Sequence, residues 1–141
     1  MKVLYDTSVL VAALLVEHSN HDKALPLLEL AKRGDAEGYL STHSLAELYA
    51  VMTRLPEPLK VLPDEAKALI EDLLTYLKPV PLEADDYQKA IARLMTLKMI
   101  GGVVFDAIIA QAALKAGVTR LITLNAKDFV RLGDEIAEML F

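Results

Sequence analysis

The sequence predicts an α/β fold in which helices cover both faces of a parallel sheet. Two kinds of segment that alternate along the chain support this class. Short apolar runs with the length of buried strands alternate with longer segments whose apolar residues recur at helical spacing. Neither an internal repeat nor a linker divides the 141 residues, so a single domain over residues 1–141 is expected. Helices that alternate with strands imply βαβ units with right-handed crossovers, and therefore parallel strands.

The first half of the chain opens with a buried strand. Residues 2–5 are mainly apolar, and the run stops at Asp6 before a second apolar segment begins. Residues 45–52 show the i, i+3, i+4, i+7 spacing of an amphipathic helix. The elements expected before the first proline-rich loop begin with a strand over residues 2–5 and a helix over residues 8–16. A second helix, capped by Ser19 or Asn20, runs to residue 32, and a short strand follows over residues 39–41. A third helix, capped by Thr42 or Ser44, runs to residue 54.

The second half continues the alternation after a loop over residues 56–63. Prolines at positions 79 and 81 place the next strand at a sheet edge, because proline cannot donate a hydrogen bond within a central strand. Gly117 has the position of a helix C-terminal glycine. The expected elements are helices over residues 64–77, 85–97 and 105–116, strands over residues 79–82 and 121–123, and a tail that is either helix or edge strand.

Composition narrows the classes of partner and of metal site. Fifteen basic and twenty acidic residues give a net charge of −5, which argues against nucleic-acid binding through bulk positive charge. Cys is absent, so disulfides and thiolate metal sites are excluded. No apolar run reaches the ~18 residues of a membrane span, and no basic segment precedes the first one, so a cytoplasmic protein without membrane contact is expected. The apolar content of 54% favours an additional buried interface.

Asp6 is the first candidate functional residue because it directly follows a buried strand. Ligands of open α/β sheets collect beyond the carboxyl ends of the strands, which is where this carboxylate is expected. Asp is also a common helix N-cap, and this interpretation of Asp6 stays open. The hydroxyls of Thr7 and Ser8 are candidates either to hold the carboxylate in place or to cap the helix themselves.

Glu47 and Asp106 are acids within strongly apolar helices. Glu47 has apolar neighbours at nearly every helical spacing, although Ser44-x-x-Glu47 also matches a capping box. Asp106 is expected in the first turn of a buried helix, where an acid also suits the helix dipole. Since helix starts and strand ends share one edge of a doubly wound sheet, Asp106 can meet Asp6 there.

Asn125 and Asp128 follow the last clear strand and belong to the same edge, although Asn125 is alternatively the cap of a short helix. All of these candidates offer oxygen ligands, and buried charges persist when they are paired or coordinated to metal. Oxygen ligands suit Mg²⁺ or Mn²⁺ rather than Zn²⁺, and such ions clamp phosphate oxygens and activate water. His18 and His21 lie in a polar loop, so a metal role for them is not expected.

Four segments of the chain, taken in order, resemble the PIN-domain ribonucleases, and in particular the VapC-type toxins of bacterial and archaeal toxin–antitoxin pairs. These segments are Asp6-Thr7-Ser8-Val9-Leu10, Ser44-Leu45-Ala46-Glu47-Leu48, Asp106-Ala107-Ile108-Ile109-Ala110 and the run from Leu121 to Phe129. The resemblance covers nearly the whole chain. It implies a three-layer α/β/α sandwich around a short parallel sheet.

The resemblance also implies roles for individual residues. It implies an acidic core that binds Mg²⁺ or Mn²⁺, formed by Asp6, Glu47 and Asp106. Asn125 completes the implied catalytic set, and it stands where many relatives carry a fourth acid. The resemblance also implies four side chains that support this core, namely Thr7, Ser8, Thr123 and Asp128.

The implied activity is metal-dependent endonucleolytic hydrolysis of RNA, which leaves 5′-phosphate and 3′-hydroxyl ends. The implied partners are the RNA substrate, a cognate antitoxin whose tail enters the acidic groove, and a second copy of the chain in a homodimer. A non-catalytic module that binds RNA or protein is an alternative, because Asn125 replaces an acid. A phosphatase with Asp6 as nucleophile is disfavoured, because such enzymes usually carry a second Asp two residues later, where this chain has Ser8.

Overall fold

A four-stranded parallel sheet forms the centre of the computed structural model, which describes residues 1–141. The strand order is β3-β2-β1-β4, and all three pairings are parallel. The strands are β1 (Lys2–Tyr5), β2 (Glu37–Ser41), β3 (Leu77–Val80) and β4 (Arg120–Ile122). This arrangement confirms the predicted α/β class with a short parallel sheet.

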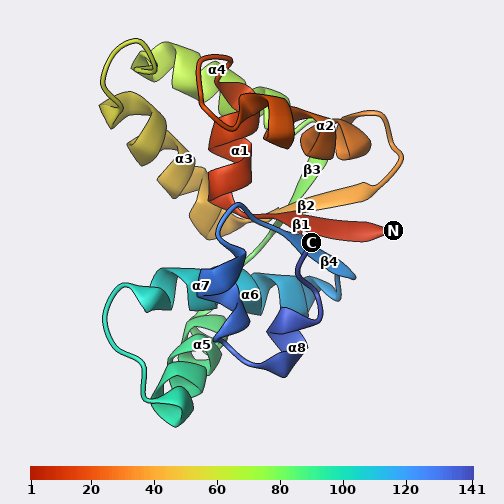
Figure 1. Ribbon diagram of the computed structural model, residues 1–141, viewed down its shortest axis with the longest axis vertical. Coiled ribbons are helices and arrows are strands. Elements are labelled where there is room, and N and C mark those ends of the chain that lie inside the picture. Colours follow the sequence, from red (N-terminus) through yellow and green to blue (C-terminus); the bar gives the residue numbers. More distant parts are fainter.

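Helices cover both faces of the sheet, as the three-layer sandwich requires (Figure 1). One layer contains α1 (Thr7–Leu14), α2 (His21–Lys32), α3 (Thr42–Arg54) and α4 (Pro63–Leu73). The other layer contains α5 (Ala84–Leu97), α6 (Val103–Ala116), α7 (Ala126–Val130) and α8 (Asp134–Ala137). None of these helices combines the length and apolarity needed to cross a bilayer.

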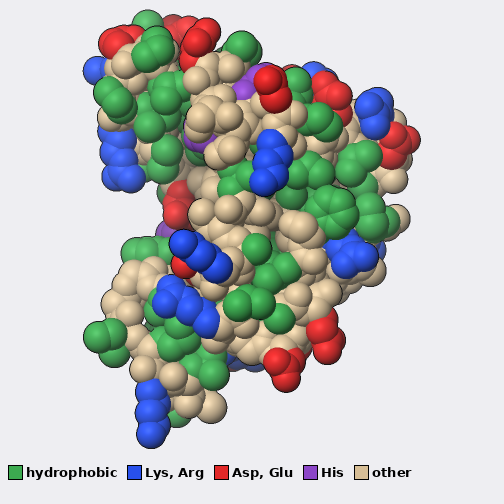
Figure 2. Space-filling view, viewed as in Figure 1, with side chains coloured by type: hydrophobic (Ala, Val, Ile, Leu, Met, Phe, Trp, Pro, Cys, Tyr) green, Lys and Arg blue, Asp and Glu red, His purple; other side chains and the backbone are tan.

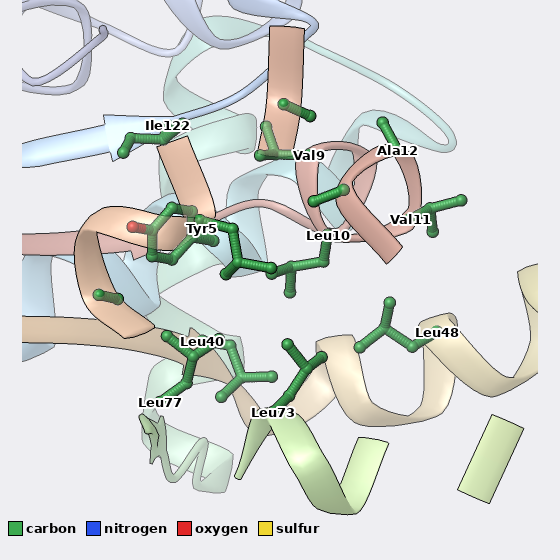
Figure 3. Packing of buried hydrophobic residues seen from close by; sticks show 14 of the residues in the cluster. Tyr5, Val9, Leu10, Val11, Ala12, Leu40, Leu48, Leu73, Leu77 and Ile122 are labelled. Carbon is green, nitrogen blue, oxygen red and sulfur yellow. The ribbon is translucent and has the colours of Figure 1, made fainter. Parts of the chain in front are cut away.

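The sheet separates two hydrophobic cores, and the alternation of side chains along β1 supplies both. Val3 and Tyr5 point into the core beneath α1 to α4, whereas Leu4 belongs to the core beneath α5 to α8. In Figure 3, Leu10 and Leu40 lie around the ring of Tyr5. The Tyr5 hydroxyl donates a 2.6 Å hydrogen bond to the carbonyl of Leu27, so this large side chain is buried with its polar end satisfied.

Gly38 allows β2 to approach its neighbours closely. A Cβ at this position would lie 2.5 Å from Leu77 Cδ2 and 2.7 Å from Ala31 Cβ. Both distances are far below ordinary van der Waals contact, so the strand accepts only glycine here without displacement of its neighbours.

Several predicted boundaries were wrong. The helix predicted over 64–77 ends at Leu73, and Leu77 instead begins β3, paired with Gly38. Leu73 and Leu77 are four residues apart and both buried, so their spacing fits one helical face equally well. The strand predicted over 79–82 therefore lies two residues earlier, although it occupies the expected sheet edge.

Smaller shifts affect the other elements. The first helix ends at Leu14 rather than at residue 16, β2 begins at Glu37, and α6 begins at Val103, two residues before its predicted start. The tail, predicted as helix or edge strand, forms α7 and α8 and then makes one parallel bridge between Leu140 and Leu121.

Candidate active site

A cleft of about 460 Å³ lies beyond the carboxyl ends of β1 and β4. Figure 2 shows a hollow between the two helical layers, on the side where α3 lies in Figure 1, with acidic side chains inside it. The structure brings all four residues of the predicted catalytic set to the cleft wall, namely Asp6, Glu47, Asp106 and Asn125. Parallel strands end at one edge of the sheet, which explains why residues so distant in sequence meet there.

Asp6 is buried, with 5% of its surface exposed, and two hydroxyl groups hold its carboxylate. Ser8 Oγ and Thr123 Oγ1 each donate a 2.8 Å hydrogen bond to Asp6 Oδ2. Asp6 occupies the N-cap position of α1, but its side chain makes no capping bond. The carboxylate therefore serves the network at the cleft instead of the helix end.

The same two hydroxyls connect Asp6 to the segment after β4. Ser8 Oγ accepts a 3.2 Å hydrogen bond from the amide of Leu124, and Thr123 Oγ1 accepts a 2.9 Å bond from the amide of Asn125. Each hydroxyl thus accepts from the backbone and donates to the carboxylate, which leaves its proton no freedom to point elsewhere. Ser8 and Thr123 consequently hold the Asp6 carboxylate in place.

Burial raises the pKa of Asp6 above its ordinary value of 3.8, and the hydrogen bonds from Thr123 and Ser8 partly oppose this increase. No Lys or Arg forms an ion pair with Asp6, Glu47 or Asp106. The negative charge of Asp6 is therefore stabilised by the hydroxyls of Thr123 and Ser8 and by the backbone amides of Thr7 and Ser8, with no cationic side chain as partner.

Thr7 connects Glu47 to a cluster of hydroxyls at the start of α3. Thr7 Oγ1 lies 3.0 Å from Glu47 Oε1 and 2.9 Å from Ser44 Oγ, and its single proton can serve one of them at a time. The N-cap of α3 is Ser41, whose side chain accepts from the amide of Ser44 at 3.1 Å. The Ser44–Glu47 capping box was therefore wrong, because the helix begins early enough to place Glu47 in its second turn.

Asp106 lies in the first turn of α6, and its carboxyl has a raised pKa, like that of Asp6. Burial, followed by the negative charges of Asp6 and Asp128, raises the pKa of Asp106 to about 6. Glu47 adds a smaller contribution in the same direction, and Arg131 opposes it. The acids of the cleft are therefore close enough to repel one another.

Asn125 and Asp128 differ in their relation to the cleft. Asn125 is exposed and occupies the N-cap position of α7 without a side-chain capping bond, so its amide is free to face the cleft. Asp128 is half-buried and lies outside the cleft wall, where it acts on the pKa of Asp106. Asp128 is therefore not part of the cleft wall, and a supporting role for it stays a prediction.

The donor set of the cleft fits a divalent cation. Three carboxylates without a cationic partner, one of them with its pKa raised to about 6, form an excess of negative charge that a hard oxygen-seeking ion would neutralise. No three acidic or histidine side chains converge closely enough to coordinate one ion as they stand. Binding therefore requires side-chain rotation, which the half-exposed positions of Glu47 and Asp106 allow.

Sequence reasoning missed the apolar half of the cleft. Val51, Leu55 and Leu59 line the wall next to Glu47. Glu47, Val51 and Leu55 are spaced four residues apart, so helical periodicity alone could have placed them on one face. His18 also lines the cleft.

Comparisons with known proteins agree with the fold. A model of the PIN domain family matches residues 3–135. The chain is 34% identical to "Ribonuclease VapC40" of Mycobacterium tuberculosis over 116 residues, which cover 82% of this chain and 81% of that protein. It is 32% identical to "Ribonuclease VapC27" of the same organism over 108 residues, or 77% of this chain and 74% of that protein.

Solved structures share the fold at lower sequence identity. The VapBC2 complex of Rickettsia felis, solved bound to a promoter DNA fragment, contains a chain with TM-score 0.70 and 22% identity, and the match covers 100% of this chain and 98% of that one. VapC20 of Mycobacterium tuberculosis has TM-score 0.67 and 19% identity, with 84% and 86% covered. Through the matched family model and these relatives, the chain belongs to the PIN-domain family.

Proposed function

We propose that this chain is a metal-dependent endoribonuclease and the toxin component of a toxin–antitoxin pair. The observation that carries the proposal is the set of three carboxylates in one cleft without a cationic side chain. The names of the relatives, which are ribonucleases, support the assignment of RNA as substrate.

Asp6, Glu47 and Asp106 are the proposed ligands of Mg²⁺ or Mn²⁺. A bound ion of this kind polarises phosphate oxygens and lowers the pKa of water for in-line attack on a phosphodiester. Asn125 would contribute a neutral amide oxygen where a fourth carboxylate would add charge. Asp6 is held through Oδ2 by Ser8 and Thr123, and its Oδ1 accepts from neither hydroxyl, so this oxygen is available as a ligand.

The charge of the cleft explains why RNA binding would depend on the ion. No Lys or Arg lines the cleft, so an approaching phosphate would meet only carboxylates and neutral groups. A divalent ion bound there would offset most of this negative charge and would give phosphate oxygens a cationic group to contact. Asp6, Glu47 and Asp106 would orient the ion, and no Lys or Arg of the cleft wall would compete with it for these carboxylates.

Cleavage of labelled single-stranded RNA tests the proposal. Wild type should cut with Mg²⁺ or Mn²⁺ and not with EDTA, and Asp6→Asn should lose the activity while it keeps the fold by circular dichroism. Asp134→Asn, at the exposed start of α8, is the matched control and should behave as wild type. Cleavage that persists in EDTA, or in a pure preparation of Asp6→Asn, would overturn the assignment.

The proposed partners are an antitoxin and a second copy of this chain. The neighbouring structures include toxin–antitoxin complexes, and the apolar wall of Val51, Leu55 and Leu59 offers a surface for a partner segment. Light scattering should report a homodimer for the isolated chain. A monomer at all accessible concentrations would contradict that part of the proposal.

A non-catalytic binding module is the second candidate, and it rests on two observations. The carboxylates do not converge as they stand, and residue 125 is Asn. Calorimetric titration with Mn²⁺ separates the two functions, because a pure binding module has no need to bind the ion at these acids.

A further inference from the structure

Two aromatic rings stack beside the cleft at the point where the two helical layers meet. His43, in the first turn of α3, lies parallel to Phe105, in the first turn of α6, with ring centroids 5.6 Å apart and an interplanar angle of 8°. Phe105 is 50% exposed. His43 therefore lies parallel to Phe105 on one side, and half of the Phe105 side chain stays exposed, where a further planar group could stack.

Both members of the stack are tied to the acids of the cleft. Phe105 directly precedes Asp106 in the chain, and His43 Nε2 lies 3.7 Å from Glu47 Oε1. That distance is too long for a hydrogen bond, and Nε2 is buried without a hydrogen-bond partner. A buried polar atom without a partner indicates that the ring is held there for a reason other than its own hydrogen bonding.

Charge attraction alone gives this chain little affinity for RNA, so RNA binding needs a further, uncharged contact. The chain has a net charge of −5, and no basic side chain lines the cleft. The usual attraction between basic side chains and phosphates is therefore weak here. Single-stranded RNA is instead commonly held by bases that stack on aromatic side chains, and this contact is insensitive to charge.

We propose that Phe105, backed by His43, is a stacking platform for an unpaired base of the RNA next to the phosphate held at the acidic cleft. This inference rests on the proposed ribonuclease function and adds a substrate-binding residue to it. Phe105 contacts the base, and His43 is a positioning residue that keeps the ring parallel to the incoming nucleotide. The free face of Phe105 accepts any base, so the platform supplies affinity with little sequence preference.

Fluorescence offers a direct test, because the chain contains no Trp. Phe105→Trp, combined with Asp6→Asn to prevent cleavage, places a single reporter at the proposed platform. A short single-stranded RNA should quench its emission, whereas an abasic oligomer of the same phosphate charge should not. Phe141→Trp in the same background is the control, since Phe141 is 60% exposed and lies against Arg120 at the opposite end of β4.

Affinity and turnover provide the second test. Phe105→Leu should raise the KM for single-stranded RNA about 5- to 150-fold, the range expected for loss of one stacked base, and leave kcat at saturation close to wild type. His43→Ala should weaken binding in the same direction, and His43→Phe should restore it. Ile100→Ala removes a side chain that is 92% exposed in the preceding loop and should change neither constant.

Each outcome decides the question. Equal quenching by the abasic oligomer would show that the indole reporter of Phe105→Trp senses phosphate alone. A change in emission with protein concentration alone would show that another copy of the chain covers the ring. Either result would overturn the proposal of a stacking platform. RNA that binds by anisotropy without quenching would also overturn it, while wild-type cleavage leaves the ribonuclease function intact. Failure of wild type to bind or cleave RNA under any metal would instead refute the ribonuclease function and the platform with it.

Discussion

Replacing Asp106 with Asn should stabilise the metal-free protein, even though Asp106 belongs to the proposed active site. Burial and the charges of Asp6 and Asp128 raise the pKa of Asp106 from 3.8 to about 6. An acid whose pKa is higher in the folded protein than in the unfolded chain binds more protons when folded. The free energy of unfolding therefore falls as the pH rises from 3.8 to about 6, and it stays lower above that range.

The magnitude follows from the same pKa difference. A rise from 3.8 to about 6 corresponds to about 3 kcal/mol. Because Asp106 is partly exposed and water screens the repulsion, we expect Asp106→Asn to gain about 1–2 kcal/mol above pH 7. Near pH 4 the wild-type carboxyl is mostly protonated in the folded state, so the gain should vanish there.

Urea unfolding followed by circular dichroism, in EDTA and across this pH range, measures the effect. Asp134→Asn serves as the matched control, because it removes an exposed carboxylate that does not line the cleft and should give no such gain. The reasoning is refuted if Asp106→Asn destabilises the protein at every pH, or if its gain is the same at low and high pH. Added Mn²⁺ should stabilise wild type more than the variant, because only wild type retains the full ligand set.

Three further substitutions address single contacts. Thr123→Val removes one of the two hydroxyl donors to the buried carboxylate of Asp6. The rate of RNA cleavage should therefore fall about tenfold, and the acidic limb of the pH–rate profile should move to higher pH. An unchanged profile would contradict this role of Thr123. Asn125→Asp should tighten Mn²⁺ binding about tenfold in calorimetry, and an unchanged affinity would show that residue 125 does not face the ion. Gly38→Ala should lower the free energy of unfolding by about 1–3 kcal/mol, because the added methyl would lie 2.5 Å from Leu77 Cδ2. The control is Gly102→Ala, whose added methyl meets nothing within 4 Å. Equal urea midpoints for the two variants would refute this account.

The candidate site was predictable from the sequence where local order determines position. Asp6 follows a buried strand, and Asp106 begins a buried helix, so the geometry of a parallel sheet brings both to one edge. The same argument placed Asn125 and Asp128 after the last strand. These predictions needed only the chain direction of each element and no detail of packing.

The features that could not be predicted from the sequence depend on contacts between residues distant along the chain. Whether residue 77 continues a helix or begins a strand is decided by its pairing with Gly38, and no local pattern contains that information. The stack of His43 on Phe105 joins residues on opposite layers, and the apolar wall of the cleft becomes visible only once α3 is packed against α1. Local periodicity suggests which residues share a face, but packing determines what that face meets.

The two cores lie on opposite faces of a narrow sheet, and the proposed ligands are drawn from both layers, with Glu47 on α3 and Asp106 on α6. An ion bound by both acids would link the layers, so its loss and the opening of this edge would become a single event. Because cleavage by proteases follows the population of opened protein, chains that lack the ion would be degraded first. Metal supply would then set the lifetime of the protein as well as its activity.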